Sequence, residues 1–333
     1  MSLPERGPAG RAAGALDLLV IGDCNPDVMV VGGDVTPAFG QQEKLVDGIS
    51  LEVGGSASIT AVAAARLGLT VALAAVVGDD PAGRFMTGQL AAEGVGTAAV
   101  AVRPGMPTGM TVALSAGADR AILTATGALS SLTSGDVPSA LLTRARHVHV
   151  SSYFLMADSL GPGLAALLAE ARAAGASTSL DTNWDPAQRW GDPWLTEALA
   201  HTSLLLPNEA EALRLAGAPG LEQAVAALTA AGPALAVKLG GRGALCTAGG
   251  RRYLASPPPV AVTDTTGAGD CFNAGVIAGL LDGLDLPAAV ALGCAAGAAS
   301  TRAPGGTAGC PDLVTARGLA RAVTVREIAA PPA

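Results

Sequence analysis

Asp264-Thr265-Thr266-Gly267-Ala268-Gly269-Asp270 leads directly into an apolar stretch, residues 271–280, that has the pattern of a buried helix. Small residues at a helix entrance leave backbone N–H groups free to close around an anion. Asp270 places a carboxylate where that anion would sit, which is unfavourable unless the carboxylate takes part in chemistry, such as taking a proton from an attacking hydroxyl. The alternative is that Asp270 caps the helix and that the glycines only form a tight turn.

The composition limits what the chain can be. Half of its 333 residues are hydrophobic, but only 3% are aromatic, so the core must be built from Ala, Val and Leu. This length suits one large α/β domain or two modest ones. The net charge of −8 argues against nucleic acid or an anionic membrane as a partner, and an anionic substrate would need local positive charge or backbone N–H groups.

Cysteine usage and the chain ends bear on location. The five cysteines are scattered, odd in number and without a Cys-x-x-Cys pair, which predicts reduced, buried thiols in a cytoplasmic protein. We find no secretory signal pattern and no apolar run of about 18 residues. Residues 1–15 are rich in Pro, Gly, Ala and Arg and are predicted to be disordered.

The order of elements predicts an α/β fold. Residues 16–22 form a short apolar run typical of a buried parallel strand, and residues 23–27 follow at its carboxyl end, where open α/β sheets bind ligands. Strands are expected near 71–77, 147–151, 177–180, 204–206, 234–239 and 244–247, and helices near 57–67, 82–93, 160–174, 208–215, 221–231, 270–281, 286–300 and 314–322. This alternation predicts a mainly parallel sheet with helices on both faces. Two helix-free blocks, about 28–50 and 98–125, are predicted to form a small β lid.

Several common nucleotide and hydrolase motifs are absent from the sequence. It has no Gly-x-x-x-x-Gly-Lys-[Ser/Thr] phosphate loop and no Gly-x-Gly-x-x-Gly after its first strand. It also lacks the Gly-x-Ser-x-Gly of hydrolases.

Five segments in a fixed order carry a family resemblance. They are residues 21–27; 54–57 with 61–68 and 77–80; 180–183; 207–211 with 237–243; and 264–270 with the tail 299–305. In these segments the chain resembles the ribokinase-like (PfkB) carbohydrate kinases over roughly residues 16–312. The resemblance implies one three-layer α/β/α kinase domain with a mainly parallel central sheet and a small β-sheet lid.

The resemblance also implies the chemistry. It points to a phosphotransferase that moves the γ-phosphoryl group of ATP to a sugar hydroxyl. Asp270 would be the general base, and the N–H groups of Gly267, Ala268 and Gly269 would form the anion hole. Positioning and charge stabilisation are the main work in phosphoryl transfer, and this loop supplies both.

Sugar-binding residues are expected near the first strand and in the lid. By the resemblance, Asn25 and Asp27 hold substrate hydroxyls, which suits a polyol because neither needs a charged partner. Gly54 and Gly55 would let the backbone approach the sugar, or would only form the turn into the next helix. Arg120, in the predicted lid, can pair with an anionic substrate group or simply decorate a hairpin.

Nucleotide-binding residues are expected in the fourth segment. Asn208 and Glu211 lie one helical turn apart, and the family uses this pair to organise Mg²⁺ and phosphate. Without the resemblance, the same pair favours a helix cap at Asn208 followed by a solvated carboxylate at Glu211. Lys238, Gly240 and Gly243 would border the ATP phosphates and ribose, although a lysine that ends a strand is usually just exposed.

Two further expectations concern a cation and assembly. Asp264, with backbone carbonyls near Thr266, Ala299, Arg302 and Gly305, matches the region where some relatives bind K⁺. A homodimer through the lid strands is also expected, since exposed strand edges attract partners.

The chain departs from the ribokinase pattern after the glycine pair. Ribokinases usually carry Lys and Asn where this chain has Ser56 and Ile59, so two polar sugar contacts are missing and strict ribokinase activity is in doubt. A nucleoside kinase is one alternative, though Phe39 is the main aromatic residue near the lid blocks. A catalytically silent sugar-binding protein is another, and Asp270 argues against it because a binder would not need that carboxylate.

Overall fold

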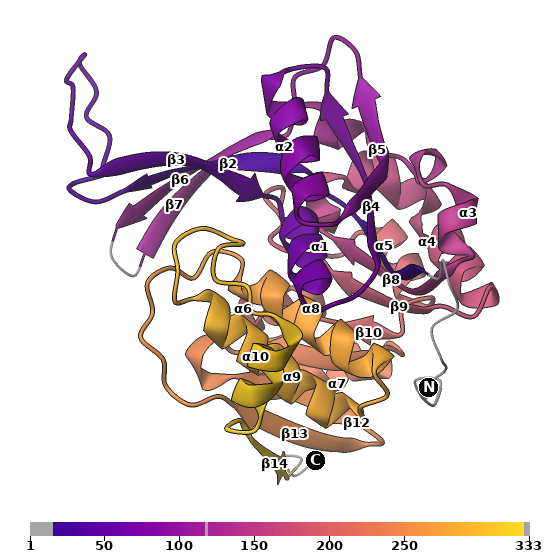
Figure 1. The fold of residues 1–333 in the computed structure, drawn as a ribbon. Helices are drawn as coiled ribbons and strands as arrows, with labels where there is room; N and C mark the ends of the chain where they lie inside the picture. Colours follow the sequence, from indigo (N-terminus) through magenta and orange to yellow (C-terminus); the bar gives the residue numbers. More distant parts are fainter. Residues whose placement is uncertain (1–15, 117–118, 330–333) are drawn as a thin grey trace.

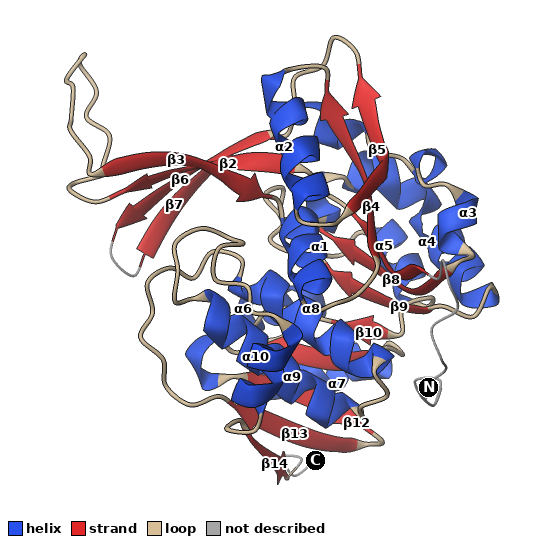
Figure 2. Cartoon of the chain, in the orientation of Figure 1, coloured by secondary structure: helices blue, strands red, loops and turns tan. Residues whose placement is uncertain are grey.

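The computed structural model describes residues 16–116 and 119–329. Within these residues, the chain forms a large sheet with helices on both faces and a smaller sheet that projects to one side (Figures 1 and 2). The predicted α/β class is confirmed. Residues 1–15, predicted to be disordered, lie outside the described residues.

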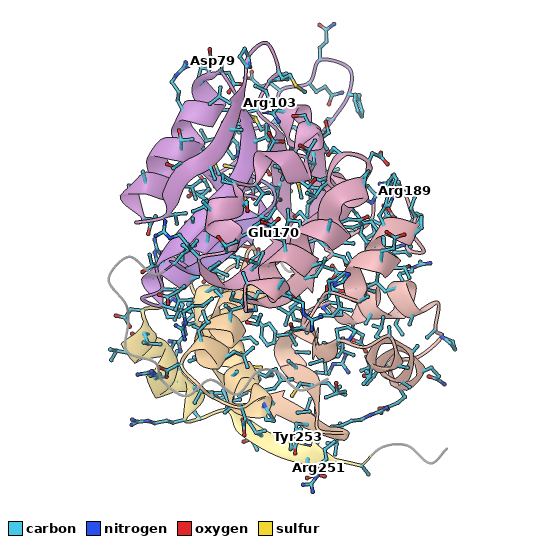
Figure 3. The ribbon with its side chains drawn as sticks, turned by 90° about the vertical axis from the view of Figure 1, so that its right-hand side faces the viewer. Asp79, Arg103, Glu170, Arg189, Arg251 and Tyr253 are labelled. Carbon is cyan, nitrogen blue, oxygen red and sulfur yellow. The ribbon has the colours of Figure 1, made fainter. Side chains whose placement is uncertain are left out.

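The large sheet comprises ten strands in the described part of the chain, in the order β14-β13-β12-β11-β10-β9-β8-β1-β4-β5. The strands are β1 (Leu16–Ile21), β4 (Val71–Gly78), β5 (Gly96–Arg103), β8 (Ala145–Ser151), β9 (Ser177–Asp181), β10 (Leu204–Leu205), β11 (Ala234–Lys238), β12 (Ala244–Ala248), β13 (Arg251–Ser256) and β14 (Thr324–Ile328). Pairing is parallel from β11 to β5 and antiparallel from β11 to β14. Figure 3 shows the two ends of this sheet, with Arg103 of β5 far from Arg251 and Tyr253 of β13.

Helices cover both faces of the large sheet. One face carries α1 (Ser56–Arg66), α2 (Pro81–Ala92), α8 (Ala268–Leu281), α9 (Leu286–Ser300) and α10 (Leu313–Ala320). The other carries α3 (Ser139–Leu142), α4 (Ala157–Ala173), α5 (Pro193–Leu199), α6 (Glu209–Ala216) and α7 (Leu221–Ala230). No described helix has both the length and the apolar character needed to cross a bilayer.

The central strand β1 is apolar from Leu18 to Ile21 because it is buried on both faces. Leu18 and Val20 are buried on the side of α1 and α8, whereas Leu19 and Ile21 are buried on the side of α4. A parallel strand covered on both faces cannot alternate apolar with polar residues, because both sets of side chains lie in a core.

The smaller sheet is the lid, in the order β3-β2-β6-β7. Its strands are β2 (Asn25–Val31), β3 (Gly48–Gly54), β6 (Met110–Ala116) and β7 (Asp119–Ala125). The second lid block was predicted to begin near residue 98, which is wrong, because residues 96–103 form β5 and pair with β4 in the large sheet. Figure 1 shows the connection between β2 and β3 extending from the outer end of the lid.

Helices α8 and α9 pack closely through small residues. A Cβ atom on Gly293 would lie 2.6 Å from Val276 Cγ2 and 2.8 Å from the Phe272 carbonyl oxygen, so the two helices meet where Gly293 has no side chain. This contact fixes α8, which carries Asp270, against the body of the protein.

Replacing Gly293 by Ala is expected to destabilise the fold by about 1–3 kcal/mol, because the added methyl group overpacks the contact. The matched control is Gly318→Ala in α10, where an added Cβ meets no other atom within 4 Å. That change is expected to be neutral or to stabilise by up to about 1 kcal/mol, since Ala favours a helix more than Gly does. Urea unfolding of both variants tests this, and equal effects would contradict it.

Candidate active site

The site lies where strands of the large sheet end beside the first turn of α8. Asp23 follows β1, Asp181 ends β9 and Lys238 ends β11. A Cβ atom placed on Gly269 would lie 3.5 Å from Lys238 Nζ, so the α8 entrance and the strand ends meet. This is the carboxyl edge of the parallel strands, where open α/β sheets bind ligands.

The entrance to α8 needs glycine. Gly267 occupies the N-cap position with φ of 72°, and a Cβ there would lie 2.5 Å from the Gly306 carbonyl oxygen. The Ala268 N–H donates to the Thr265 carbonyl at 3.2 Å. The helix begins at Ala268 rather than at Asp270, so Asp270 is its third residue and the alternative of an Asp270 cap is wrong.

Asp270 is a buried carboxyl group with a perturbed pKa. It is 7% exposed, and its pKa is raised to about 8. The largest cause is burial, followed by the negative charge of Asp181; Lys238 lowers the pKa, Asp23 raises it, and the Ser56 hydroxyl lowers it as a hydrogen-bond partner. A carboxyl group with this pKa can accept a proton near neutral pH.

A chain of hydrogen bonds runs from Ser56, in α1, through Asn183 to Ser152, which follow β9 and β8. Asn183 Nδ2 donates to Ser56 Oγ at 3.0 Å, and Asn183 Oδ1 accepts from the Ser152 N–H at 2.8 Å. Asn183 and Ser152 both have positive φ, 55° and 58°, which is strained for non-glycine residues and typical of functional sites. Because the Asn183 amide donates to the Ser56 oxygen, the Ser56 hydroxyl hydrogen is available for Asp270. Neither Asn183 nor Ser152 was among the predicted site residues, and their places just after the neighbouring strands β9 and β8 were the only signal for them.

Asn25 and Asp27 come together at the base of the lid. Asn25 Nδ2 lies 3.3 Å from Asp27 Oδ1 and 3.1 Å from Thr111 Oγ1 of β6. A Cβ on Gly54 would lie 2.0 Å from Asp27 Oδ1, and one on Gly55, whose φ is 79°, would lie 2.9 Å from Asn25 Oδ1. The two glycines therefore make room for the polar side chains themselves.

Asp23 caps the start of helix α1 from outside the helix, because the N-cap residue, Gly55, has no side chain to do so. Its carboxylate oxygens accept the N–H groups of Ser56 at 3.0 Å and Ala57 at 2.8 Å. Asp23 is 4% exposed, and burial raises its pKa. Asp23, like Thr111, was not among the predicted site residues.

Asn208 and Glu211 form a capping box at the start of α6. Glu211 accepts the Asn208 N–H at 2.8 Å, and Asn208 Oδ1 accepts the Glu211 N–H at 2.9 Å. The alternative of a cap is thus correct, but the carboxylate is not solvated, since Glu211 is only 4% exposed. Burial, followed by the charge of Asp181, raises its pKa to about 7.

Lys238 is not the exposed strand-end lysine of the alternative interpretation. Its side chain is 13% exposed and forms an ion pair with Asp181, which is fully buried. Burial acts to lower the pKa of Lys238, but the carboxylates of Asp181 and Glu211 raise it above its usual value. Gly240 and Gly243 flank the short turn after β11, with φ of 59° and 94°.

The predicted monovalent cation residues are only partly brought together. Asp264 accepts hydrogen bonds from the Thr266 N–H and hydroxyl at 2.9 and 2.8 Å and from the Gly305 N–H at 2.8 Å. The Ala299 carbonyl accepts the Arg302 N–H at 3.2 Å, and the Arg302 carbonyl accepts from Thr263 Oγ1, also at 3.2 Å. Among the described residues, no group of three or more His, Cys, Asp or Glu side chains is arranged to hold a metal ion.

Two other residues singled out from the sequence are Ile59 and Arg120. Ile59 is buried behind the α8 entrance, where its side chain lies within 3.0 Å of the Cβ positions of both Gly267 and Gly306. Arg120 lies in β7 opposite Ser115 of β6, and its side chain is outside the described part of the structure.

The chain matches known proteins along most of its length. The model of the pfkB family of carbohydrate kinases matches residues 15–313. Ribokinase of Bacillus subtilis is 30% identical over 297 residues, 89% of this chain and 96% of the ribokinase. 2-Dehydro-3-deoxygluconokinase of the same organism is 31% identical over 288 residues, 80% of this chain and 86% of that protein.

A solved structure agrees on the fold. A ribokinase II-like protein of Escherichia coli, in complex with ATP and Mg²⁺, aligns with a TM-score of 0.81 at 24% identity, covering 92% of this chain and 99% of that one. The predicted ribokinase-like fold and sugar kinase activity are confirmed, and the chain belongs to the pfkB family of carbohydrate kinases.

Proposed function

We propose that Asp270 is the general base of this ATP-dependent sugar kinase and that the α8 entrance holds the phosphoryl group during transfer. The observation that carries this proposal is a buried carboxyl group with a pKa near 8, three residues after the glycine N-cap of a helix. Asp270 takes the proton of the attacking sugar hydroxyl, while N–H groups of Gly267, Ala268 and Gly269 stabilise the phosphoryl charge.

Lys238, Asn208, Glu211, Gly240 and Gly243 form the proposed ATP and Mg²⁺ side of the site. Asn208 and Glu211 would hold a bound Mg²⁺, which would supply positive charge to offset that of the phosphates. The residues fit such an ion because Glu211 is a buried carboxyl group whose pKa is raised partly by Asp181, and a nearby cation would relieve that repulsion. A Cβ on Gly240 would meet no other atom within 4 Å, which leaves open backbone for the phosphates two residues after Lys238, whereas Gly243 allows the turn to pack against the Ala255 carbonyl.

Asn25, Asp27, Gly54 and Gly55 form the proposed sugar side. Amide and carboxylate oxygens at the lid base suit hydroxyl groups, and the glycines leave the space that the Asn25 and Asp27 side chains occupy there. Arg120 remains a candidate for an anionic group on the substrate. Because Ser56 and Ile59 replace the polar residues of ribokinases, the preferred sugar is expected to differ from ribose.

The proposed K⁺ site is centred on Asp264, with carbonyl oxygens of Thr266, Ala299, Arg302 and Gly305. Hard oxygen donors of this kind suit an alkali or alkaline-earth cation. Asp264 also ties the loop before α8 to the tail through the Gly305 N–H, so an ion there would stiffen the anion hole.

The cytoplasm is the proposed location. All five cysteines are free and buried, as expected for a protein kept in a reducing compartment.

The proposed assembly is a homodimer through the lid. Ile49, Leu51 and Leu123 are 67%, 44% and 65% exposed and share the lid face opposite Asn25 and Asp27. Such a face is apolar over several strands and is best covered by a second copy of itself.

Leu123→Lys is expected to lower the mass measured by light scattering from that of a dimer to that of a monomer, because it places a charge in the apolar face. Val314→Lys is the control, since Val314 is 82% exposed in α10, outside the lid. A monomeric unmodified protein would contradict the proposal.

A kinase screen tests the function directly. Product formation from ATP would be measured over aldoses, ketoses, keto-deoxy acids and nucleosides, with Asp270→Asn as the control. Turnover of a sugar supports the proposal, and turnover of nucleosides alone would replace it with a nucleoside kinase. No turnover on any of them, with binding retained in both forms, would mean a silent sugar-binding protein.

A further inference from the structure

Asp181 joins the strand ends to the catalytic helix. It ends β9 and is fully buried. Its Oδ2 atom accepts hydrogen bonds from Lys238 Nζ, at the end of β11, and from Asn273 Nδ2 of α8 at 2.6 Å. Asn273 lies three residues after Asp270, on the next turn of the helix. The Asp181 carboxylate thus contacts both Lys238, at the α8 entrance, and Asn273, on the turn of α8 that follows Asp270.

Stability alone does not account for this arrangement. The Asp181 side chain is fully buried and that of Lys238 is nearly so. Removing both charges from water cancels much of their attraction, and well-packed apolar residues often serve stability as well or better. Asn273 is also fully buried, and its Oδ1 atom has no hydrogen-bond partner among the described residues. A buried polar cluster that is incompletely paired is more readily explained by a role in the site than by folding.

The location of Lys238 indicates the role of the cluster formed by Asp181, Lys238 and Asn273. Lys238 Nζ lies 3.5 Å from the place a Cβ on Gly269 would occupy, so its ammonium group stands beside the α8 entrance. We propose that Asp181 is a positioning residue that holds the Lys238 ammonium group against this entrance and, through Asn273, holds the turn of α8 that carries Asp270. This inference rests on the proposed function, because Asp181 would fix the distance between the Lys238 ammonium group, on the phosphate side, and Asp270, the proposed base.

The charges around the base give the proposal a distinctive consequence. Burial is the largest cause of the raised pKa of Asp270, and the charge of Asp181 is the next. The other groups that face Asp270 are Lys238 from β11, Asp23 after β1 and Ser56 from α1. Asp181 itself also acts on Glu211 of α6 and on His149 of β8. Removing the charge of Asp181 therefore lowers the pKa of Asp270, because a repelling neighbour is lost and Lys238 is no longer neutralised.

The test is Asp181→Asn in the full-length protein, with ATP and the sugar found in the screen. We expect kcat to fall by up to about 100-fold, as for small misplacements in other sites, while KM for the sugar changes little. The acid limb of the kcat/KM profile should move to lower pH. The matched control is Asp185→Asn, because Asp185 is equally buried but binds the N–H groups of Ala187 and Arg189; it should leave kcat and the limb unchanged.

A double variant shows whether Asp181 acts through Lys238. Asp181→Asn/Lys238→Met should match Lys238→Met in kcat within about twofold, since the Lys238 ammonium group is already gone and the new amide oxygen can still accept the hydrogen bond from Asn273. This variant leaves no unpaired buried charge from the pair, so it also serves if Asp181→Asn does not fold. Independent losses with an unmoved acid limb would overturn the positioning role. An unmodified enzyme that phosphorylates no substrate would instead overturn the proposed function.

Discussion

Asp270→Asn is expected to lower kcat by about 10²- to 10⁴-fold, the range typical of a lost general base. The amide has nearly the same shape as the carboxyl group but cannot accept the proton of the sugar hydroxyl. Because Asp270 is buried and its charged form is disfavoured there, the neutral amide should fit the folded protein well. The loss should therefore appear in turnover rather than in folding or substrate affinity.

Three measurements separate these effects. Steady-state kinetics gives kcat, calorimetry gives the affinities for sugar and ATP, and thermal unfolding gives Tm. Asp285→Asn is the control: Asp285 caps α9 by accepting the Ala288 N–H at 2.9 Å, away from the strand ends that form the site, and should leave kcat unchanged. If Asp270→Asn kept more than about a tenth of the original kcat, a general base worth about 10²-fold or more would be excluded.

The sheet and its helices could be predicted largely because buried segments have a recognisable pattern of apolar residues. Strands such as β1 and β4 lie between two helical layers. β4 is apolar along its whole length and β1 is apolar from Leu18 to Ile21, which makes both recognisable as short apolar runs. Strands β13 and β14 were not predicted. They lie at one end of the sheet, are mostly exposed or half-buried, and carry charged residues, so they have no apolar pattern to find.

The lid boundary shows a different limit of sequence reasoning. Residues 98–103 alternate between more and less buried positions as a lid strand would, yet they belong to β5 at the edge of the large sheet. Alternation reports that one face of a strand is buried, but not which sheet buries it. Only the pairing with β4 settles that point.

The candidate site was predictable where one motif supplies several residues. Gly267 and Asp270 lie within one helical turn, and Asn208 and Glu211 within another, so spacing alone places each pair. Asp181, Ser56 and Asn183 were in the quoted segments without assigned roles, because each contacts residues from a different part of the chain. Ile59 was considered for its missing sugar contact, whereas the structure packs it behind the α8 entrance.

The second prediction with a large effect concerns pH. We expect kcat/KM to rise about tenfold per pH unit below about pH 8 and to level off above it, because only the deprotonated form of Asp270 can act as the base. The sign follows from the raised pKa: as pH falls below it, a growing share of Asp270 is protonated. Between pH 8 and pH 6 the loss should be roughly 50-fold, because half of Asp270 is deprotonated at pH 8 and about one hundredth at pH 6.

The kcat/KM profile reports the free enzyme, so rates would be measured with both substrates well below saturation. The ionisation of ATP also contributes to such a profile, and the weak residual activity of Asp270→Asn provides the correction, since it should keep the ATP contribution and lose the limb of the base. A limb near pH 4 would show that Asp270 titrates like a solvated carboxyl group. That result would require Lys238 to outweigh both burial and the charge of Asp181. The α8 entrance would then be a far more positive site than the buried carboxylates around it suggest.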